Sequence, residues 1–121
     1  MNHRKTGTEK EELAQEFLTR HGVRILFRNY HFHKIGEIDL IGIQEDSLLF
    51  VEVKYRKDDS FGLPEEAVNG AKQMTISRVA TGFLCVHPEY GGLKVRFDVI
   101  AIDKKKIKWI WNAFPYRGKG F

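Results

Sequence analysis

Two short apolar segments, residues 36–43 and 48–55, carry the charged side chains best suited to chemistry. The first segment holds Asp39, and the second holds Glu52 and Lys54. Carboxylates are the side chains with which proteins hold a hard divalent cation, and an amine stabilises charge on a phosphate oxygen. These three residues are therefore the first candidates for an active site.

The spacing of the two segments predicts that Asp39 lies opposite Glu52. Residues 44–47 are polar and suit a tight turn, and a symmetric hairpin around them also places Glu37 opposite Lys54. Opposed side chains have Cβ atoms about 5 Å apart, and like charges placed so destabilise a sheet. A divalent cation would remove this conflict, because Mg²⁺ binds through one or two carboxylates together with substrate phosphate and water.

Two other arrangements of the hairpin give no metal site. In the first, Lys54 neutralises its neighbours in a cross-strand cluster of salt bridges. In the second, a register shift of one residue moves Asp39 and Glu52 to opposite faces of the sheet. The remaining positions are apolar on both faces, which is typical of inner strands, and they predict that Ile38 shares a face with Leu40.

Hydrophobic periodicity predicts the elements that must position this hairpin. Leu13, Ala14, Phe17 and Leu18 recur at helical spacing, and Pro64 suits the first turn of a second helix. The order is α-β-β-β-α-β-β, which predicts a single α/β domain over residues 1–121 with a mixed central sheet flanked by helices. The predicted helices span residues 9–21 and 64–86, and the predicted strands span 23–32, 36–44, 48–55, 95–102 and 107–111.

Composition narrows the class of protein. The hydrophobic fraction of 42% is typical of a folded globular chain, and Cys85, the single cysteine, excludes an internal disulfide and any multi-cysteine zinc site. The polar N-terminus and the absence of a long apolar run predict a cytoplasmic protein with no membrane partner. A net charge of +4 favours binding to phosphate backbones.

The candidate residues resemble a known signature. Asp39, followed after twelve residues by Glu52-Val53-Lys54, resembles the motif of the PD-(D/E)XK nuclease superfamily. Nearly the whole chain resembles the YraN-like family of small bacterial proteins, although Lys10-Glu11 stands where that family often has Gly-Glu. The matching blocks are Thr6-Gly7 with Glu11, Ala14 and Phe17-Leu18, then Arg28-Asn29-Tyr30, Gly36-Glu37-Ile38-Asp39-Leu40-Ile41, Phe50-Val51-Glu52-Val53-Lys54-Tyr55-Arg56, Phe61-Gly62, Lys72, Arg96-Phe97-Asp98 and Asn112-Ala113-Phe114.

This resemblance implies a restriction endonuclease-like core with a fold similar to that of Holliday-junction resolvases. It also implies that the protein is a metal-dependent endonuclease that hydrolyses DNA, with branched or structured DNA as its substrate. Asp39 and Glu52 would hold Mg²⁺ or Mn²⁺, with the Val53 carbonyl as a further ligand. Lys54 would orient the attacking water or stabilise charge on the phosphate. Glu11 would be a catalytic carboxylate from the first helix, although a favourable charge near a helix N-terminus explains it equally.

Several neighbouring residues are weaker candidates. Glu37 would support the metal ligands or act as an alternative ligand, and a salt bridge to Lys54 is the other interpretation. Arg56 would hold a phosphate. Lys72 and Gln73 would contact nucleic acid from the second helix, unless they are simply solvated.

The alternative function is a non-catalytic module that binds nucleic acid or a protein on a nuclease fold. The complete set of Asp39, Glu52 and Lys54 favours the enzyme, and nothing in the sequence separates DNA from RNA. A homodimer is expected by analogy with resolvases, because a four-way junction offers two symmetric strands. Arg96-Phe97-Asp98 is predicted to fix a strand by packing and a buried ion pair.

Overall fold

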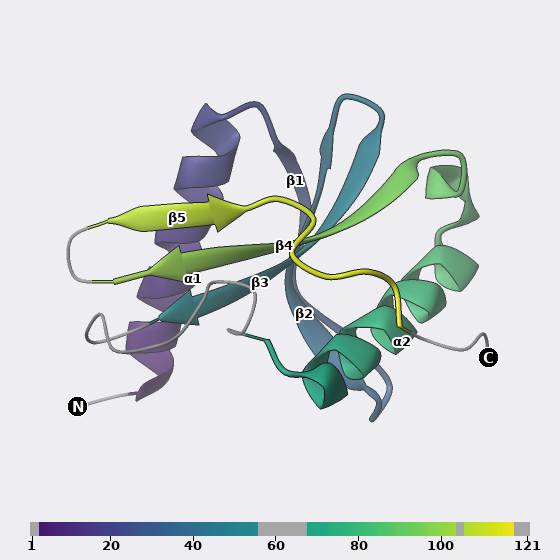
Figure 1. Cartoon of the computed structure of the whole chain (residues 1–121), viewed down its shortest axis with the longest axis horizontal. Coiled ribbons are helices and arrows are strands. Elements are labelled where there is room, and N and C mark those ends of the chain that lie inside the picture. The colour runs from purple at the N-terminus through teal and green to yellow at the C-terminus, as the bar shows by residue number, and fades with distance from the viewer. Residues whose placement is uncertain (1–2, 56–67, 104–105, 118–121) are drawn as a thin grey trace.

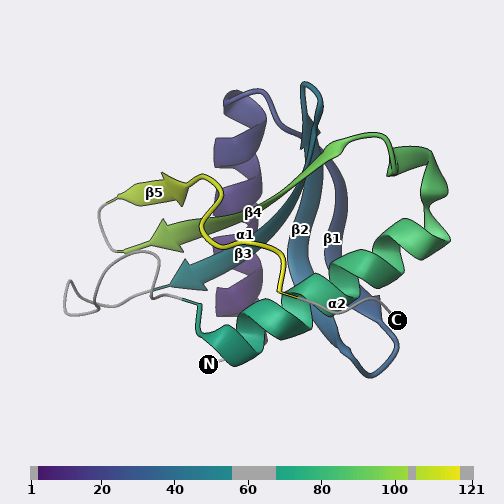
Figure 2. The ribbon, with the colours of Figure 1, turned by 45° about the vertical axis from the view of Figure 1, so that its right-hand side comes forward.

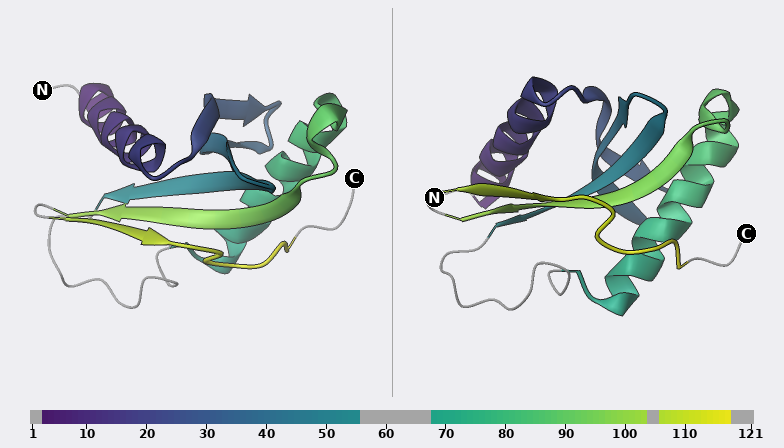
Figure 3. Two further views of the ribbon diagram at one scale, coloured as in Figure 1. Left: turned by 90° about the horizontal axis from the view of Figure 1, so that it is seen from above. Right: turned by 45° about the horizontal axis from the view of Figure 1, so that its top comes forward.

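A mixed five-stranded sheet lies at the centre of the fold, with one helix on each face (Figures 1 and 3). The computed structural model describes residues 3–55, 68–103 and 106–117, and their side chains from Glu9 onward. The elements are α1 His3–Arg20, β1 Arg24–Phe32, β2 Gly36–Gln44, β3 Ser47–Tyr55, α2 Gly70–Val86, the 3₁₀ helix η2 Pro88–Tyr90, β4 Lys94–Ile102 and β5 Ile107–Ile110.

The strands lie in the order β1-β2-β3-β4-β5. The pair β3–β4 is parallel and the other three pairs are antiparallel. A parallel pair needs a crossover connection, and α2 lies in the connection between β3 and β4. The predicted α/β class, with a mixed sheet and helices packed on it, is confirmed.

Apolar side chains on the sheet form one core layer under each helix. On β3, Leu49 and Val51 pack with Ala14 and Leu18 of α1, whereas alternate residues such as Phe50 pack on the side of α2. Both layers consist of fully buried residues, so the prediction that the hairpin is covered on both faces is confirmed. No described helix is long and apolar enough to cross a membrane.

The register of the β2–β3 hairpin agrees with the symmetric turn predicted from the sequence. Leu40 pairs with Val51, and Ile41 pairs with Phe50. The turn itself contains Glu45 at a positive φ of 54°. The backbone pairing recorded for these strands ends at Leu40–Val51, one residue short of Asp39, so the site begins where β2 separates from β3.

The prediction that Ile38 shares a face with Leu40 is wrong. Ile38 packs in the layer under α2, and Leu40 packs in the layer under α1 even though the two residues are separated by one position. The side-chain alternation reverses between them, where Asn29 of β1 lies opposite Asp39 and adopts a positive φ of 50°. Asn tolerates this left-handed conformation, which turns the strand about its own axis.

Two glycines allow α2 to lie against the far end of the β1–β2 hairpin. A Cβ at Gly82 would lie 2.5 Å from the ring of Phe32, and a Cβ at Gly36 would lie 2.5 Å from the Thr75 methyl group. Real Cβ atoms do not approach so closely, so both positions need glycine for the helix to pack this near. These contacts fix α2 relative to the strands that carry the site.

Both predicted helix starts are wrong. Helix α2 begins at Gly70, because the Asn69 side chain caps it by accepting a hydrogen bond of 2.9 Å from the Lys72 backbone N–H. Pro64, the predicted first residue, lies outside the described residues. Helix α1 begins at His3 rather than at Glu9, so that residues 3–8, with Gly7 among them, extend the predicted helix.

Candidate active site

Asp39 occupies the point where β2 and β3 part. Its Oδ2 accepts a hydrogen bond of 2.8 Å from the Val53 backbone N–H. In the regular ladder this N–H would have bonded to the backbone of β2, so the carboxylate replaces a main-chain acceptor. The N–H and C=O of one strand residue point to the same side, and the Val53 carbonyl therefore also faces β2 and Asp39.

The carboxyl groups of Asp39 and Glu52 lie within hydrogen-bonding reach of each other, as the hairpin register predicts. The pKa of Asp39 is raised from 3.8 to about 7, first by burial and next by the negative charge of Glu52, with a smaller contribution from the charge of Glu37. The hydrogen bond from Val53 opposes this pKa shift without cancelling it. The site therefore holds two acids that resist simultaneous ionisation.

Two lysines approach the second acid of this pair. The Glu52 side chain is 7% exposed, and its Oε2 lies 3.5 Å from the Lys54 Nζ and 3.7 Å from the Lys72 Nζ. Lys54 comes from the same strand, whereas Lys72 comes from the first turn of α2. The cluster thus combines the predicted carboxylate pair with the salt bridges that the sequence offered as an alternative.

The donor set fits a divalent cation that takes its remaining ligands from substrate and water. Within residues 9–55, 68–103 and 106–117, no three His, Cys, Asp or Glu side chains gather around one point, so a closed protein cage is not formed. Asp39 and Glu52 provide two hard oxygen donors, and the Val53 carbonyl provides a third facing the same gap. Mg²⁺ is commonly held by one or two carboxylates with phosphate and water completing the shell.

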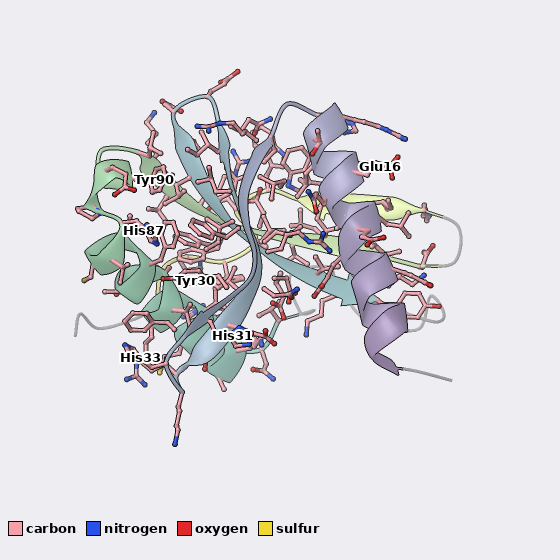
Figure 4. All side chains as sticks on the ribbon, turned by 180° about the vertical axis from the view of Figure 1, so that it is seen from behind. Glu16, Tyr30, His31, His33, His87 and Tyr90 are labelled. Atoms are coloured by element: carbon pink, nitrogen blue, oxygen red, sulfur yellow. The ribbon has the colours of Figure 1, made fainter. Side chains whose placement is uncertain are left out.

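The structure places the two other predicted acids beside this centre. Glu11 of α1 accepts a hydrogen bond of 3.1 Å from the side chain of Asn29, the residue opposite Asp39 on β1. Glu37 lies 3.0 Å from the Nε2 of His31, near the end of the β1–β2 hairpin (Figure 4), rather than beside Lys54. The predicted Glu37–Lys54 salt bridge is therefore wrong.

Gln73 does not present its side chain for nucleic-acid binding as predicted. It is 8% exposed, and its Nε2 donates a hydrogen bond of 2.8 Å to the Val68 carbonyl. Its Oε1 accepts a hydrogen bond from the Nε of Arg117. Sequence reasoning missed Arg117, because no motif signals a contact across such a separation. Arg56, the other predicted phosphate ligand, lies outside the described residues.

Asp98 forms a second, separate cluster around a buried carboxylate. It is fully buried and accepts hydrogen bonds from the Arg96 guanidinium at 3.0 Å, the Trp109 indole at 2.8 Å and the Asn112 backbone N–H at 2.9 Å. The Arg96 guanidinium lies 4.0 Å from the centre of the Trp111 ring. The predicted buried ion pair in β4 is confirmed, and its position in the core indicates a structural role.

Comparison with known proteins supplies a family for the chain. The profile described as uncharacterised protein family UPF0102 matches residues 10–102, a span that includes both carboxylates and both lysines of the site. The chain belongs to the UPF0102 family. The resemblance to YraN-like proteins is thereby confirmed, whereas the wider placement among PD-(D/E)XK nucleases stays a prediction.

Relatives from distant bacteria match along nearly their whole length. A UPF0102 protein of Saccharophagus degradans is 46% identical over 112 residues, covering 93% of this chain and 94% of its own. A UPF0102 protein of Vibrio parahaemolyticus is 44% identical over 112 residues, covering 91% of this chain and 92% of its own. A UPF0102 protein of Caldicellulosiruptor bescii is 43% identical over 120 residues, covering 94% of this chain and 100% of its own.

Proposed function

We propose that this UPF0102 protein is a metal-dependent endonuclease that hydrolyses phosphodiester bonds in DNA, on a restriction endonuclease-like core. The observation that carries the proposal is the juxtaposition of Asp39 and Glu52 at a break in the sheet, with two lysines at the same point. A structural site has no need for two mutually repelling acids, and a cation-binding site does.

Asp39, Glu52 and the Val53 carbonyl would hold Mg²⁺ or Mn²⁺. When bound, the ion would supply a Lewis acid for the scissile phosphate and lower the pKa of a coordinated water. The hydrogen bond from Val53 fixes the Asp39 Oδ2 and leaves the second carboxylate oxygen for a metal ion. Glu52 is buried and Asp39 is partly buried, which lowers the local dielectric and strengthens their interaction with a cation.

Lys54 and Lys72 stabilise negative charge at this centre. In the structure both ammonium groups lie against Glu52. A phosphate that approaches beside Glu52 would give each ammonium a second anionic partner, and the same two groups would then face the charge that develops on the phosphate oxygens. Lys54, on the strand of Glu52, is the catalytic lysine in this scheme, and Lys72 binds the phosphate from α2.

Branched or structured DNA is the proposed substrate, by analogy with resolvases. A four-way junction presents two equivalent strands, so we propose a homodimer with two such centres. The alternative is a module that binds nucleic acid without cutting it. The two lysines beside Glu52 support that alternative, because they would hold a phosphate without any metal.

A cleavage assay with labelled linear, single-stranded, flapped and four-way-junction DNA tests the proposal. Each substrate is incubated at low salt with Mg²⁺, Mn²⁺ or EDTA, and parallel RNA substrates test the choice of sugar. Metal-dependent cutting is expected, and Asp39→Asn or Lys54→Met is expected to lower its rate by about 100-fold or more.

The exposed pair of Lys94 and Asp46, at 3.3 Å, provides matched controls at the other end of the β2–β3 hairpin. Lys94→Met and Asp46→Asn are expected to leave the rate unchanged. If DNA binds in a salt-dependent way, is not cut with either metal, and binds equally well to Asp39→Asn, the protein is a binding module and the endonuclease proposal fails.

A further inference from the structure

The segment after β5 is fastened along α2 (Figure 2). Phe114 is 4% exposed and stacks on Phe97, with ring centres 5.3 Å apart. The hydroxyl of Tyr116 lies 2.8 Å from that of Thr81. These contacts fix the segment after β5, so that the next residue, Arg117, lies at the surface of α2.

Arg117 is attached to α2 at two points, and both anchors are buried. Its backbone N–H donates a hydrogen bond of 2.9 Å to the Ser77 hydroxyl, and its Nε donates one to the Gln73 Oε1. Gln73 is itself fixed by its bond to the Val68 carbonyl. The side chain thus runs along α2 from Ser77 towards the N-terminal end of the helix, where Lys72 reaches Glu52.

Arg96 and Arg117 differ in what neutralises them. The buried carboxylate of Asp98 neutralises Arg96, whose side chain is 14% exposed. Arg117 is exposed, and its guanidinium is held by a neutral carboxamide. Among the described residues it has no ion pair with a carboxylate. Arg117 is therefore oriented while its full positive charge is kept.

An arginine anchored through Nε directs its two terminal nitrogens away from the anchor, in the fork geometry that binds a phosphate through two hydrogen bonds. We propose that Arg117 is a phosphate-binding residue that contacts the nucleic-acid backbone beside the Asp39–Glu52 centre, and that Gln73 is its positioning residue. This inference rests on the proposed function. It gives buried Gln73 an indirect role in place of the direct contact predicted from the sequence.

Binding of a fluorescein-labelled four-way DNA junction, measured by anisotropy in EDTA over a series of salt concentrations, tests this inference without any cutting. Arg117→Gln is expected to weaken binding roughly tenfold at low salt and to lower the slope of log K against log salt by about one, as loss of one phosphate contact does. Arg78→Gln removes an exposed arginine of the same helix and is the matched control. It is expected to bind as the wild type does.

Gln73→Leu removes the hydrogen bond that positions Arg117, and it is expected to cause part of the loss of DNA affinity seen with Arg117→Gln. The double variant Gln73→Leu/Arg117→Gln should bind DNA no more weakly than Arg117→Gln alone. Arg117→Lys, which keeps the charge and the contact with Ser77 but loses the fork, should fall between wild type and Arg117→Gln. Thermal melting of every variant separates misfolding from lost binding. A purely structural Arg117 would lower the melting temperature and leave the salt slope unchanged.

If both Arg117 variants bind DNA with the affinity and salt slope of the wild type, this inference is wrong. The proposed endonuclease is unaffected by that result if the wild type still binds and cuts DNA. A wild type that neither binds DNA in this assay nor cuts it with Mg²⁺ or Mn²⁺ would overturn both proposals together.

Discussion

The protein holds carboxylates away from solvent in two places, and the groups that surround them differ. At Asp98, the charge is fully surrounded by partners: a guanidinium, an indole N–H and a backbone N–H. At Asp39, the carboxylate receives one backbone hydrogen bond and faces a second acid, Glu52, which raises its pKa. Asp98 has its charge satisfied within the fold, whereas Asp39 has no ion-pair partner among the described residues, because both lysines of the site lie against Glu52. An external cation would supply that partner.

The difference separates Asp98, which stabilises the fold, from Asp39, which the proposed function uses for chemistry. Burial of a charge is tolerated when it is paired and hydrogen-bonded, as Asp98 is. The Asp39–Glu52 pair costs stability at neutral pH, and such a cost is expected where a site must bind a ligand. The same substitution, Asp→Asn, should therefore have opposite effects on stability at the two positions.

The largest expected effect is that of Asp98→Asn. The new amide N–H would face the donors from which Asp98 now accepts hydrogen bonds. The Arg96 charge would lose its carboxylate partner while it keeps neutral contacts with Gln44 and Trp111. Breaking a buried ion pair in this way typically costs about 3 to 5 kcal/mol of unfolding free energy. Urea denaturation at pH 8 measures this change. Unchanged stability would mean that the Asp98 cluster does not hold β4 and β5 together.

The next effect is that of Asp39→Asn, and it has the opposite sign. The pKa of Asp39 is about 7 in the folded protein and 3.8 ordinarily, so the folded state holds a proton that the unfolded chain releases between these values. Wild-type stability should therefore fall as pH rises from about 4 to about 7, and Asp39→Asn should remove that fall. At pH 8 the variant should be more stable by about 2 to 4 kcal/mol.

Urea denaturation of wild type and Asp39→Asn across this pH range provides the measurement. The two proteins should be equally stable below the ordinary pKa of an aspartate and diverge above it. The comparison of the two carboxylates fails if Asp39→Asn is the less stable protein at pH 8.

The smallest expected effect belongs to Lys72→Met. The Lys72 ammonium lies 3.7 Å from the Glu52 Oε2 and competes with a cation for it. Its removal also removes a screened repulsion between the ammonium and Mn²⁺, so Mn²⁺ should bind the free protein about threefold to tenfold more tightly. Lys108→Met, which removes an exposed lysine of β5, is the control and should not change the Mn²⁺ affinity. Weaker Mn²⁺ binding in Lys72→Met would show that the lysine does not compete for Glu52.

Much of the fold could be predicted from local sequence patterns. Strand β2 was predicted with its observed bounds, because alternating apolar residues and a polar turn leave one plausible register. The reversal at Asn29 was missed, since a single left-handed residue leaves no mark on hydrophobic periodicity. The start of α2 was missed because Pro64 and Asn69 both suit a helix start, and the prediction used the earlier residue although Asn69 is the observed cap.

The candidate site divides in the same way. The closeness of Asp39 and Glu52 follows from hairpin pairing, which sequence spacing sets. The contact of Lys72 with Glu52 depends on how α2 packs, and the anchoring of Arg117 depends on a segment that returns from the far end of the chain. Such tertiary contacts have no local signal, and only the structure supplies them.

Calorimetric titration of the protein with Mn²⁺ at pH 8 tests the central claim most directly, with wild type, Asp39→Asn and Asp46→Asn compared. The account predicts saturable Mn²⁺ binding to wild type and Asp46→Asn, its loss in Asp39→Asn, and weaker binding at pH 6 as Asp39 takes up a proton. Equal Mn²⁺ binding to Asp39→Asn and wild type, or no binding to any of the three, would contradict it.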